Sequence, residues 1–131
     1  MIEKFIGLNY VKGGHDLKTG VDCWGLVICA MRDLYGIELN QHVGSMACGI
    51  ELQETIEKES KNWIEVEKPK KGDVVTMCKR GSKRPEHVGL YVGKGQVLHI
   101  ISEKHSSCLT PIRLINKLFS NIKYYRYDSN S

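Results

Sequence analysis

The apolar residues between positions 22 and 35 recur every three or four residues, which is the period of one face of an α-helix. They are Cys23, Leu26, Val27, Ala30, Met31 and Leu34. Asp22 is a residue type favoured at helix N-caps, and Gly36 is a type favoured just past the C-terminus. The sequence therefore predicts an amphipathic helix from Asp22 to about Tyr35, with Cys23 in its first turn.

Two segments of different character follow this helix. Residues 36–49 contain glycine, serine and asparagine without a steady period, which is typical of a loop. Residues 50–60 are polar and carry a helical pattern. We therefore expect a second helix from about Ile50 to Ser60.

From Trp63 onward the pattern changes to short runs rich in β-branched and aromatic residues. The runs are WIEVE (63–67), DVVTM (73–77), HVGLYVG (87–93) and QVLHII (96–101). Glycines or a basic loop separate them, as is typical of neighbouring strands. A short helix over 111–119 and a last strand, IKYYRY, are expected to follow. Helices followed by a meandering set of strands indicate an α+β domain with an antiparallel sheet.

Length and composition add few further limits. A chain of 131 residues with 41% hydrophobic residues is expected to form one domain over 1–131. The longest apolar run, Trp24 to Met31, is too short for a membrane span. The first residues, MIEKFIGLNY, do not form a secretory signal, so we expect synthesis in the cytoplasm without a signal peptide. The net charge of +4 is too small to indicate a nucleic-acid partner.

The five cysteines differ in what their positions allow. An odd number without a C-x-x-C pair argues against a disulfide framework and a zinc finger, so reduced thiols are expected. A helix N-terminus beside an imidazolium lowers a thiol pKa from about 8.5 to roughly 3.5–7.5, and Cys23 alone begins a predicted helix. Cys29, deeper in the same helix, is interpreted as a buried structural thiol. The others fall in a loop or at strand ends: Cys48, Cys78 and Cys108.

Two histidines are placed to serve Cys23. His87 opens one predicted strand and His99 lies near the end of the next, so a short hairpin brings the two imidazoles side by side. His87 would then take the proton of Cys23, and His99 would accept a hydrogen bond from the far ring nitrogen of His87 and fix its tautomer. The remaining histidines fall in apparent loops and are interpreted as solvated: His15, His42 and His105.

Five short motifs occur in a fixed order between Tyr10 and His99. They are a tyrosine ahead of a glycine pair (YVKGG), a helix start (DCWGLV), a turn (GDVV), a strand (HVGLYVG) and a second histidine (VLH). Each motif alone is common, whereas all five in this order are specific. The chain therefore resembles the NlpC/P60 family of cell-wall cysteine peptidases. The resemblance implies the papain-like fold of that family, with an N-terminal catalytic helix packed on an antiparallel β-sheet.

The resemblance also implies a catalytic set. Cys23 matches the nucleophile of the family, His87 the base and His99 the third, orienting residue. No metal and no other cofactor is implied.

A second group of residues is implied to hold the substrate. Tyr10 matches a tyrosine whose hydroxyl helps to hold the substrate carbonyl or its oxyanion. Asp22 and Trp24, which flank the nucleophile, are assigned with it to oxyanion and substrate binding. The main-chain N–H of Cys23 is a second oxyanion donor, as a helix N-terminus offers.

The implied substrate is a peptidoglycan stem peptide, which the family usually cleaves between D-γ-glutamyl and the diamino acid. The site of action is then the bacterial cell wall. Trp24 stands where many members have serine, a variant that resembles the phage-tail members of the family. This favours delivery by a phage tail, with tail-tip proteins as partners. A secreted enzyme without its leader and targeting domains would have the same sequence.

Three alternatives stay open. One cysteine and two histidines are also a catalytic zinc ligand set, although the helix start suits thiolate activation better. The same chemistry could serve an amidase or acyltransferase with another substrate. A tail or assembly protein could retain the peptidase fold with little activity.

Overall fold

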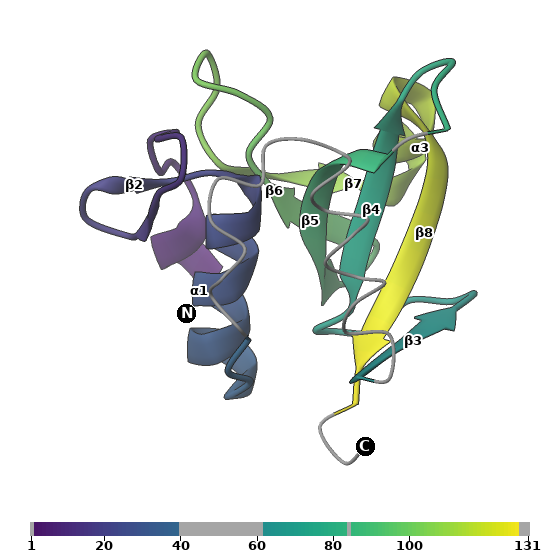
Figure 1. Ribbon diagram of the computed structural model, residues 1–131, viewed down its shortest axis with the longest axis horizontal. Coiled ribbons are helices and arrows are strands. Elements are labelled where there is room, and N and C mark those ends of the chain that lie inside the picture. The colour runs from purple at the N-terminus through teal and green to yellow at the C-terminus, as the bar shows by residue number, and fades with distance from the viewer. Residues whose placement is uncertain (1, 40–61, 84, 129–131) are drawn as a thin grey trace.

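One long helix, α1, stands against a six-stranded antiparallel sheet (Figure 1). The computed structural model describes residues 2–39, 62–83 and 85–128. The helices in these ranges are η1 (Ile2–Phe5), α1 (Cys23–Tyr35) and α3 (Ile112–Leu118). The strands are β1 (His15–Asp16), β2 (Gly20–Val21), β3 (Trp63–Val66), β4 (Val74–Lys79), β5 (Pro85–Gly93), β6 (Gln96–His99), β7 (Cys108–Pro111) and β8 (Phe119–Tyr127).

The ends of α1 lie where the sequence predicts them. The Asp22 side chain accepts a hydrogen bond from the N–H of Gly25, which satisfies one of the free donors at the helix start. Gly36 adopts a left-handed conformation with φ 67°, and its N–H closes the last turn on the carbonyl of Arg32. The predicted amphipathic helix with Cys23 in its first turn is therefore confirmed.

The sheet has the strand order β3-β8-β4-β5-β6-β7, and every neighbouring pair is antiparallel. Strands β4 to β7 follow one another as a meander. The expectation of a meander throughout is wrong, because β8, the last strand, lies between β3 and β4. This insertion gives both flanks of β8 a partner and buries strand edges that would otherwise be open.

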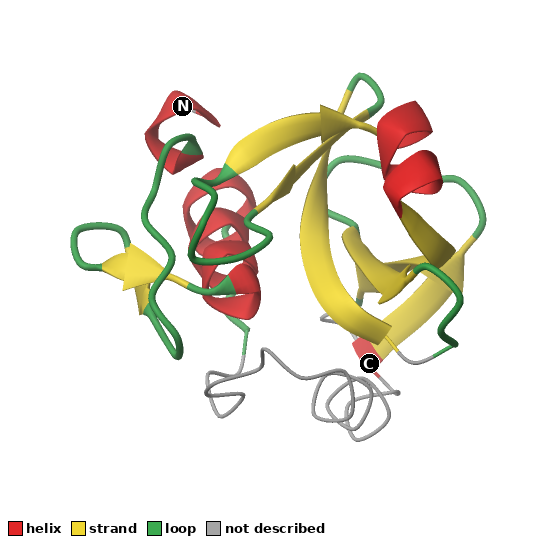
Figure 2. Cartoon of the chain, turned by 90° about the horizontal axis from the view of Figure 1, so that it is seen from above, coloured by secondary structure: helices red, strands yellow, loops and turns green. Residues whose placement is uncertain are grey.

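The sheet carries apolar side chains on both faces, as its alternating pattern allows. On one face Val74, Val88, Leu90 and Leu98 share a core with the buried side of α1. On the other face Val75, Met77 and Val97 pack with Ile115 of α3. Figure 2 shows the strands curving between these two helices. The sheet therefore joins two cores and holds the start of α1 against its strands.

The strands predicted from Trp63 onward are present, with shifted ends. The predicted strand at 96–101 ends at His99, and the last strand begins at Phe119 rather than at Ile122. Strand β7 and the short elements η1, β1 and β2 were not predicted. The predicted helix over 50–60 lies outside the described residues, as does most of the predicted loop at 36–49.

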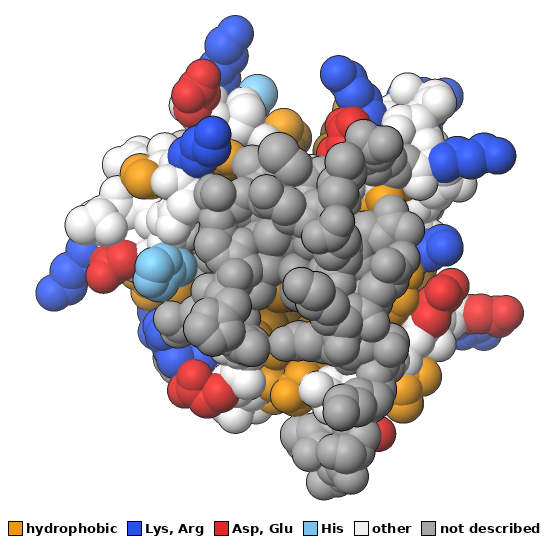
Figure 3. All heavy atoms as spheres, viewed as in Figure 1, with side chains coloured by type: hydrophobic (Ala, Val, Ile, Leu, Met, Phe, Trp, Pro, Cys, Tyr) orange, Lys and Arg blue, Asp and Glu red, His pale blue; other side chains and the backbone are white. Residues whose placement is uncertain are grey.

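Charged side chains of both signs are visible on one face of the molecule. Figure 3 shows Lys and Arg side chains interspersed with Asp and Glu side chains around the edge of that face. No helix in the described part of the chain is long and apolar enough to cross a bilayer.

Candidate active site

Cys23 is the first residue of α1, and the residue before it fixes its place. One carboxylate oxygen of Asp22 accepts the N–H of Gly25 at 2.7 Å, and the other accepts the N–H of Gly13 at 3.0 Å. The N–H of Asp22 in turn donates to the carbonyl of Gly14 at 3.0 Å. Asp22 is 1% exposed, so its carboxylate serves to tie the preceding loop to the helix start.

Glycine at position 25 is required by this loop. A Cβ added to Gly25 would collide with the carbonyl oxygen of Gly14, which is backbone and cannot swing away. Glycine within a helix is otherwise unfavourable. The glycine of the DCWGLV motif therefore lets the loop pass close over the first turn of α1.

Tyr10 is brought near the same helix start by the main chain. It forms an isolated parallel bridge with Val21, two residues before Cys23, and the N–H of Val11 donates to the carbonyl of Val21 at 3.0 Å. The Tyr10 side chain is partly buried against the core that contains Cys23. Tyr10 therefore lies near the start of α1.

The thiol of Cys23 faces strand β5. Cys23 is 4% exposed, and its sulfur receives a hydrogen bond from the main chain of Val88. Val88 follows His87 in β5. Cys23 therefore lies beside the residue of β5 that follows His87, although the two segments are far apart in the sequence.

His87 and His99 form a buried pair. Nε2 of His87 lies 2.9 Å from Nδ1 of His99, and Nε2 of His99 lies 2.8 Å from Oγ1 of Thr110 in β7. The ring of His87 also stacks on Phe119, with centroids 5.4 Å apart and planes at 22°. His87 is 7% exposed and His99 fully buried. Nε2 of His87 is thus taken by His99, whereas Nδ1 is the other nitrogen of the ring.

The hairpin between β5 and β6 makes this pairing possible. Its two turn residues, Lys94 and Gly95, have positive φ of 54° and 71°, as a type I′ turn requires. A Cβ added to Gly89 would lie 2.7 Å from Cγ1 of Val97 and 3.1 Å from Cβ of His99. The glycine of the HVG motif therefore leaves the room that His99 occupies beside His87.

Burial governs the protonation of these three groups. Burial first, and then the charge of Asp22, raise the pKa of the Cys23 thiol to about 12. Burial and then repulsion from His99 lower the pKa of His87 to about 3, and burial lowers the pKa of His99 to about 4. Burial therefore favours the neutral form of the thiol and of both imidazoles. Burial thus opposes the ionised sulfur that the helix start predicts, and it is the largest influence on the pKa of the Cys23 thiol.

Trp24 lies in the core. It is 2% exposed, and its indole Nε1 has no hydrogen-bond partner among the residues that the structure describes. Its position directly after Cys23 places it in the first turn of α1, where its ring packs with the apolar side of the helix.

Three of the remaining cysteines and histidines have places of their own, whereas Cys108 pairs with His99 across β6 and β7. Cys29 is fully buried and its Sγ donates to the carbonyl of His15 at 3.2 Å, which confirms its interpretation as a structural thiol. The side chains of His15 and His105 are exposed, as predicted. His42 and Cys48 lie outside the described residues. Within 2–39, 62–83 and 85–128, no three His, Cys, Asp or Glu side chains are grouped to hold a metal ion.

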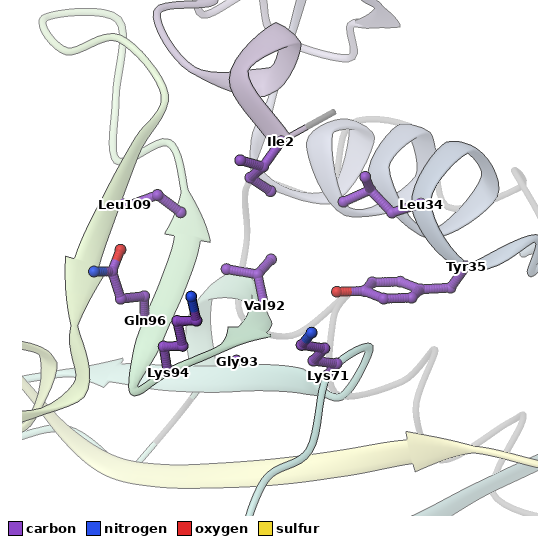
Figure 4. Close-up of a pocket in the computed structure, with 9 residues that line it drawn as sticks. All are labelled: Ile2, Leu34, Tyr35, Lys71, Val92, Gly93, Lys94, Gln96 and Leu109. Carbon is purple, nitrogen blue, oxygen red and sulfur yellow. The ribbon is translucent and has the colours of Figure 1, made fainter.

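Two of the pockets formed by the described residues differ in their position relative to the candidate site. A pocket of about 190 Å³ opens beside His87 and is lined by Lys79, Glu86, Ile101, Leu118 and Phe119. A larger pocket of about 400 Å³ lies at the far end of α1, where Leu34 and Tyr35 face the β5–β6 hairpin (Figure 4). Neither Cys23 nor the histidine pair lines the larger pocket, so of these two pockets in the described part of the chain the smaller one adjoins the candidate site.

Sequence reasoning missed Thr110 and Phe119. Both contact the histidine pair, yet neither belongs to a motif of the chain. Thr110 lies in β7, a strand of four residues that ends at Pro111 and is therefore hard to predict from the sequence. Phe119 lies at the boundary between α3 and β8. No local pattern identifies either residue, because their contacts come from the pairing of distant strands.

Two curated proteins are similar to parts of this chain. The murein DD-endopeptidase MepH of Escherichia coli (strain K12) is 34% identical over 93 residues, which cover 71% of this chain and 31% of that protein. The gamma-DL-glutamyl hydrolase of Bacillus subtilis (strain 168) is 34% identical over 101 residues, which cover 73% of this chain and 21% of that protein. The chain thus spans about a third or less of the length of these relatives.

Solved structures share the fold. The NlpC/P60 domain of the peptidoglycan hydrolase SagA superimposes with a TM-score of 0.61 at 24% identity, covering 92% of this chain and 89% of that chain. An NlpC/P60 family protein from Bacillus cereus ATCC 10987 gives a TM-score of 0.66 at 23% identity, covering 94% of this chain and 36% of that chain. These likenesses confirm the predicted α+β fold. A model of the NlpC/P60 family matches residues 7–126, and the chain therefore belongs to the NlpC/P60 family.

Proposed function

We propose that the chain is a single catalytic domain, a cysteine endopeptidase that hydrolyses peptidoglycan stem peptides. Two observations support this proposal, the place of Cys23 beside β5 and the pairing of His87 with His99. Cys23 begins α1 against β5, and β5 carries His87, whose Nε2 contacts His99 at 2.9 Å. A thiol, a base and a group that orients the base are the parts that covalent acyl transfer needs. The proposed set of catalytic residues is therefore Cys23, His87 and His99.

The first half of the reaction forms a thioester. Sγ of Cys23 attacks the carbonyl carbon of the scissile amide while its proton passes to Nδ1 of His87. The resulting oxyanion is held by the main-chain N–H of Cys23 and the hydroxyl of Tyr10. When the oxyanion collapses, the C–N bond breaks and the leaving amine takes the proton from His87. The acyl part of the substrate then remains bound to the sulfur.

The second half releases the acid. His87 takes a proton from water, the resulting hydroxide attacks the thioester carbonyl, and the C–S bond breaks. The proton on His87 returns to the sulfur, and the neutral thiol is restored. His99 accepts a hydrogen bond from Nε2–H of His87 throughout and stabilises the imidazolium that forms in each half. Because the resting groups are neutral, ionisation accompanies attack on the substrate and does not precede it.

The scissile bond in this proposal is the one between D-γ-glutamyl and the diamino acid. The family resemblance supports this choice, and so does the similarity to a protein named as a gamma-DL-glutamyl hydrolase. The similarity to a murein DD-endopeptidase points to another peptide bond of the same polymer. The name of the murein endopeptidase, together with the family resemblance, supports peptidoglycan as the substrate and the cell wall as the place of action.

Digestion of purified peptidoglycan tests the proposal. The wild-type chain and Cys23→Ala are incubated with the polymer, and mass spectrometry identifies the new peptide ends. We expect new amino-terminal diamino acid and new γ-glutamyl carboxylate ends from the wild type alone. Identical fragments from both proteins would remove the enzymatic proposal. New ends at a D-alanyl bond would retain the enzyme and change the bond.

A role in a phage tail is the finer part of the proposal. Trp24 directly after Cys23 supports it through the family resemblance alone. Mass spectrometry of purified virions should detect the chain together with tail-tip proteins. If the host expresses the chain but purified virions lack it, the phage-tail role is excluded and the chain is a cellular peptidase. The competing proposal, a weakly active tail or assembly protein with this fold, requires the chain in virions and no new peptide ends.

A further inference from the structure

Thr110 is the third member of a buried hydrogen-bonded chain that begins at His87. His99 joins the two, with Nδ1 at 2.9 Å from Nε2 of His87 and Nε2 at 2.8 Å from Oγ1 of Thr110. Thr110 is 7% exposed and His99 is fully buried, so water does not compete for these groups. Beyond Thr110, its Oγ1 lies 3.6 Å from Sγ of Cys108.

The direction of these bonds follows from what His87 has to do. To accept the proton of Cys23 at Nδ1, neutral His87 must carry its own proton on Nε2, which then donates to Nδ1 of His99. Since a neutral imidazole has one donor and one acceptor nitrogen, His99 must carry its proton on Nε2. That proton has one acceptor in the described structure, Oγ1 of Thr110.

Without that acceptor the opposite arrangement becomes competitive. If the proton of His99 moved to Nδ1, it would point at Nε2 of His87 and require that nitrogen to be bare. His87 would then carry its proton on Nδ1, the nitrogen that must receive the proton of Cys23. The wrong tautomer in His99 therefore produces the wrong tautomer in His87.

We propose that Thr110 is a positioning residue that sets the tautomer of His87 through His99, by accepting the Nε2–H of His99. This inference rests on the proposed function, since it assigns His87 as the base. Thr110 suits the task because a hydroxyl can accept from His99 while its own hydrogen turns toward the weak acceptor Sγ of Cys108. A carboxylate at this place would accept as well but would bring a charge into a buried region.

Two variants separate the hydroxyl from the shape of the side chain. Thr110→Val keeps the branched shape and removes the acceptor, whereas Thr110→Ser keeps the acceptor. We expect Thr110→Val to lower kcat on a synthetic stem peptide by about 10- to 100-fold with little change in KM, as loss of an orienting partner typically does. Thr110→Ser should stay within about threefold of the wild type, and Cys108→Ala should do so too.

The tautomers can be read without substrate. Long-range ¹H–¹⁵N NMR spectra of the imidazoles should show both His87 and His99 protonated on Nε2 in the wild type. In Thr110→Val a population with protonated Nδ1 should appear in both rings. A merely structural role for Thr110 would lower the melting temperature and leave the tautomers unchanged.

Either of two results would overturn the inference. The first is a wild-type His99 protonated on Nδ1, and the second is a folded Thr110→Val protein that keeps full kcat and wild-type tautomers. If Thr110→Val does not fold, the wild-type tautomers and the Thr110→Ser kinetics decide alone. Because the spectra are recorded without substrate, they also separate a failure of this inference from a failure of the proposed peptidase activity.

Discussion

The protonation of Cys23 gives the sharpest prediction, since the structure and the local helix rule point in opposite directions. With a pKa of about 12, the thiolate fraction at pH 7 is about 10⁻⁵, whereas an ordinary thiol with a pKa near 8.5 is ionised to about 3%. Thiolate is the form that iodoacetamide alkylates. Alkylation of Cys23 in the free protein should therefore be very slow at pH 7, and its rate should rise about tenfold per pH unit from pH 6 to pH 10.

The pH dependence separates ionisation from access to a buried group. Limited access lowers the rate by the same factor at every pH, whereas a neutral thiol gives a unit slope. Mass spectrometry of the peptide that contains Cys23 measures the rate, with the Cys23→Ala protein as the blank. Asp22→Asn removes the charge that is the second cause of the raised pKa, so this variant should react faster at each pH. A rate that stays flat between pH 5 and pH 9 would show a preformed thiolate–imidazolium pair and refute the argument from burial.

Two further predictions concern the fold around the site. Gly25→Ala should destabilise the protein by about 1–3 kcal/mol, because its new methyl group meets the carbonyl of Gly14; an isolated helix would gain from the same change. Urea unfolding measures this, and an increase in stability would contradict the close approach. The pKa of His99 is lowered to about 4 in the fold, so the unfolded chain binds its proton first as the pH falls below about 6.5, and stability is lost there. The loss between pH 7 and pH 5 should shrink by up to about 2 kcal/mol in His99→Gln and stay unchanged in the exposed control His105→Gln; an equal loss in both variants would contradict this.

The local features of the fold could be predicted from the sequence. The helical period of the apolar residues predicts the first helix, and the residue types of Asp22 and Gly36 predict its two ends. The same holds for the hairpin that joins His87 to His99, since glycines mark its turn and β-branched residues its strands. These features depend on residues within a few positions of one another.

The remaining features depend on pairing between distant strands. The insertion of β8 beside β4 leaves no trace in the periodicity of either strand, and β7 is short and ends at Pro111. Thr110 reaches His99 only because β7 pairs with β6. The pKa of Cys23 could not be predicted from local sequence for the same reason. A helix start predicts a lowered pKa, whereas the burial that raises it depends on tertiary contacts that no local pattern marks.

The central claim is that the sulfur of Cys23 performs the attack. The most direct measurement is kcat/KM on a synthetic stem peptide for the wild type and for Cys23→Ala, with circular dichroism to show that both are folded. Loss of the nucleophile should lower kcat/KM by about 10⁴-fold or more. A folded Cys23→Ala protein that cleaves the same bond within tenfold of the wild-type rate would contradict the account.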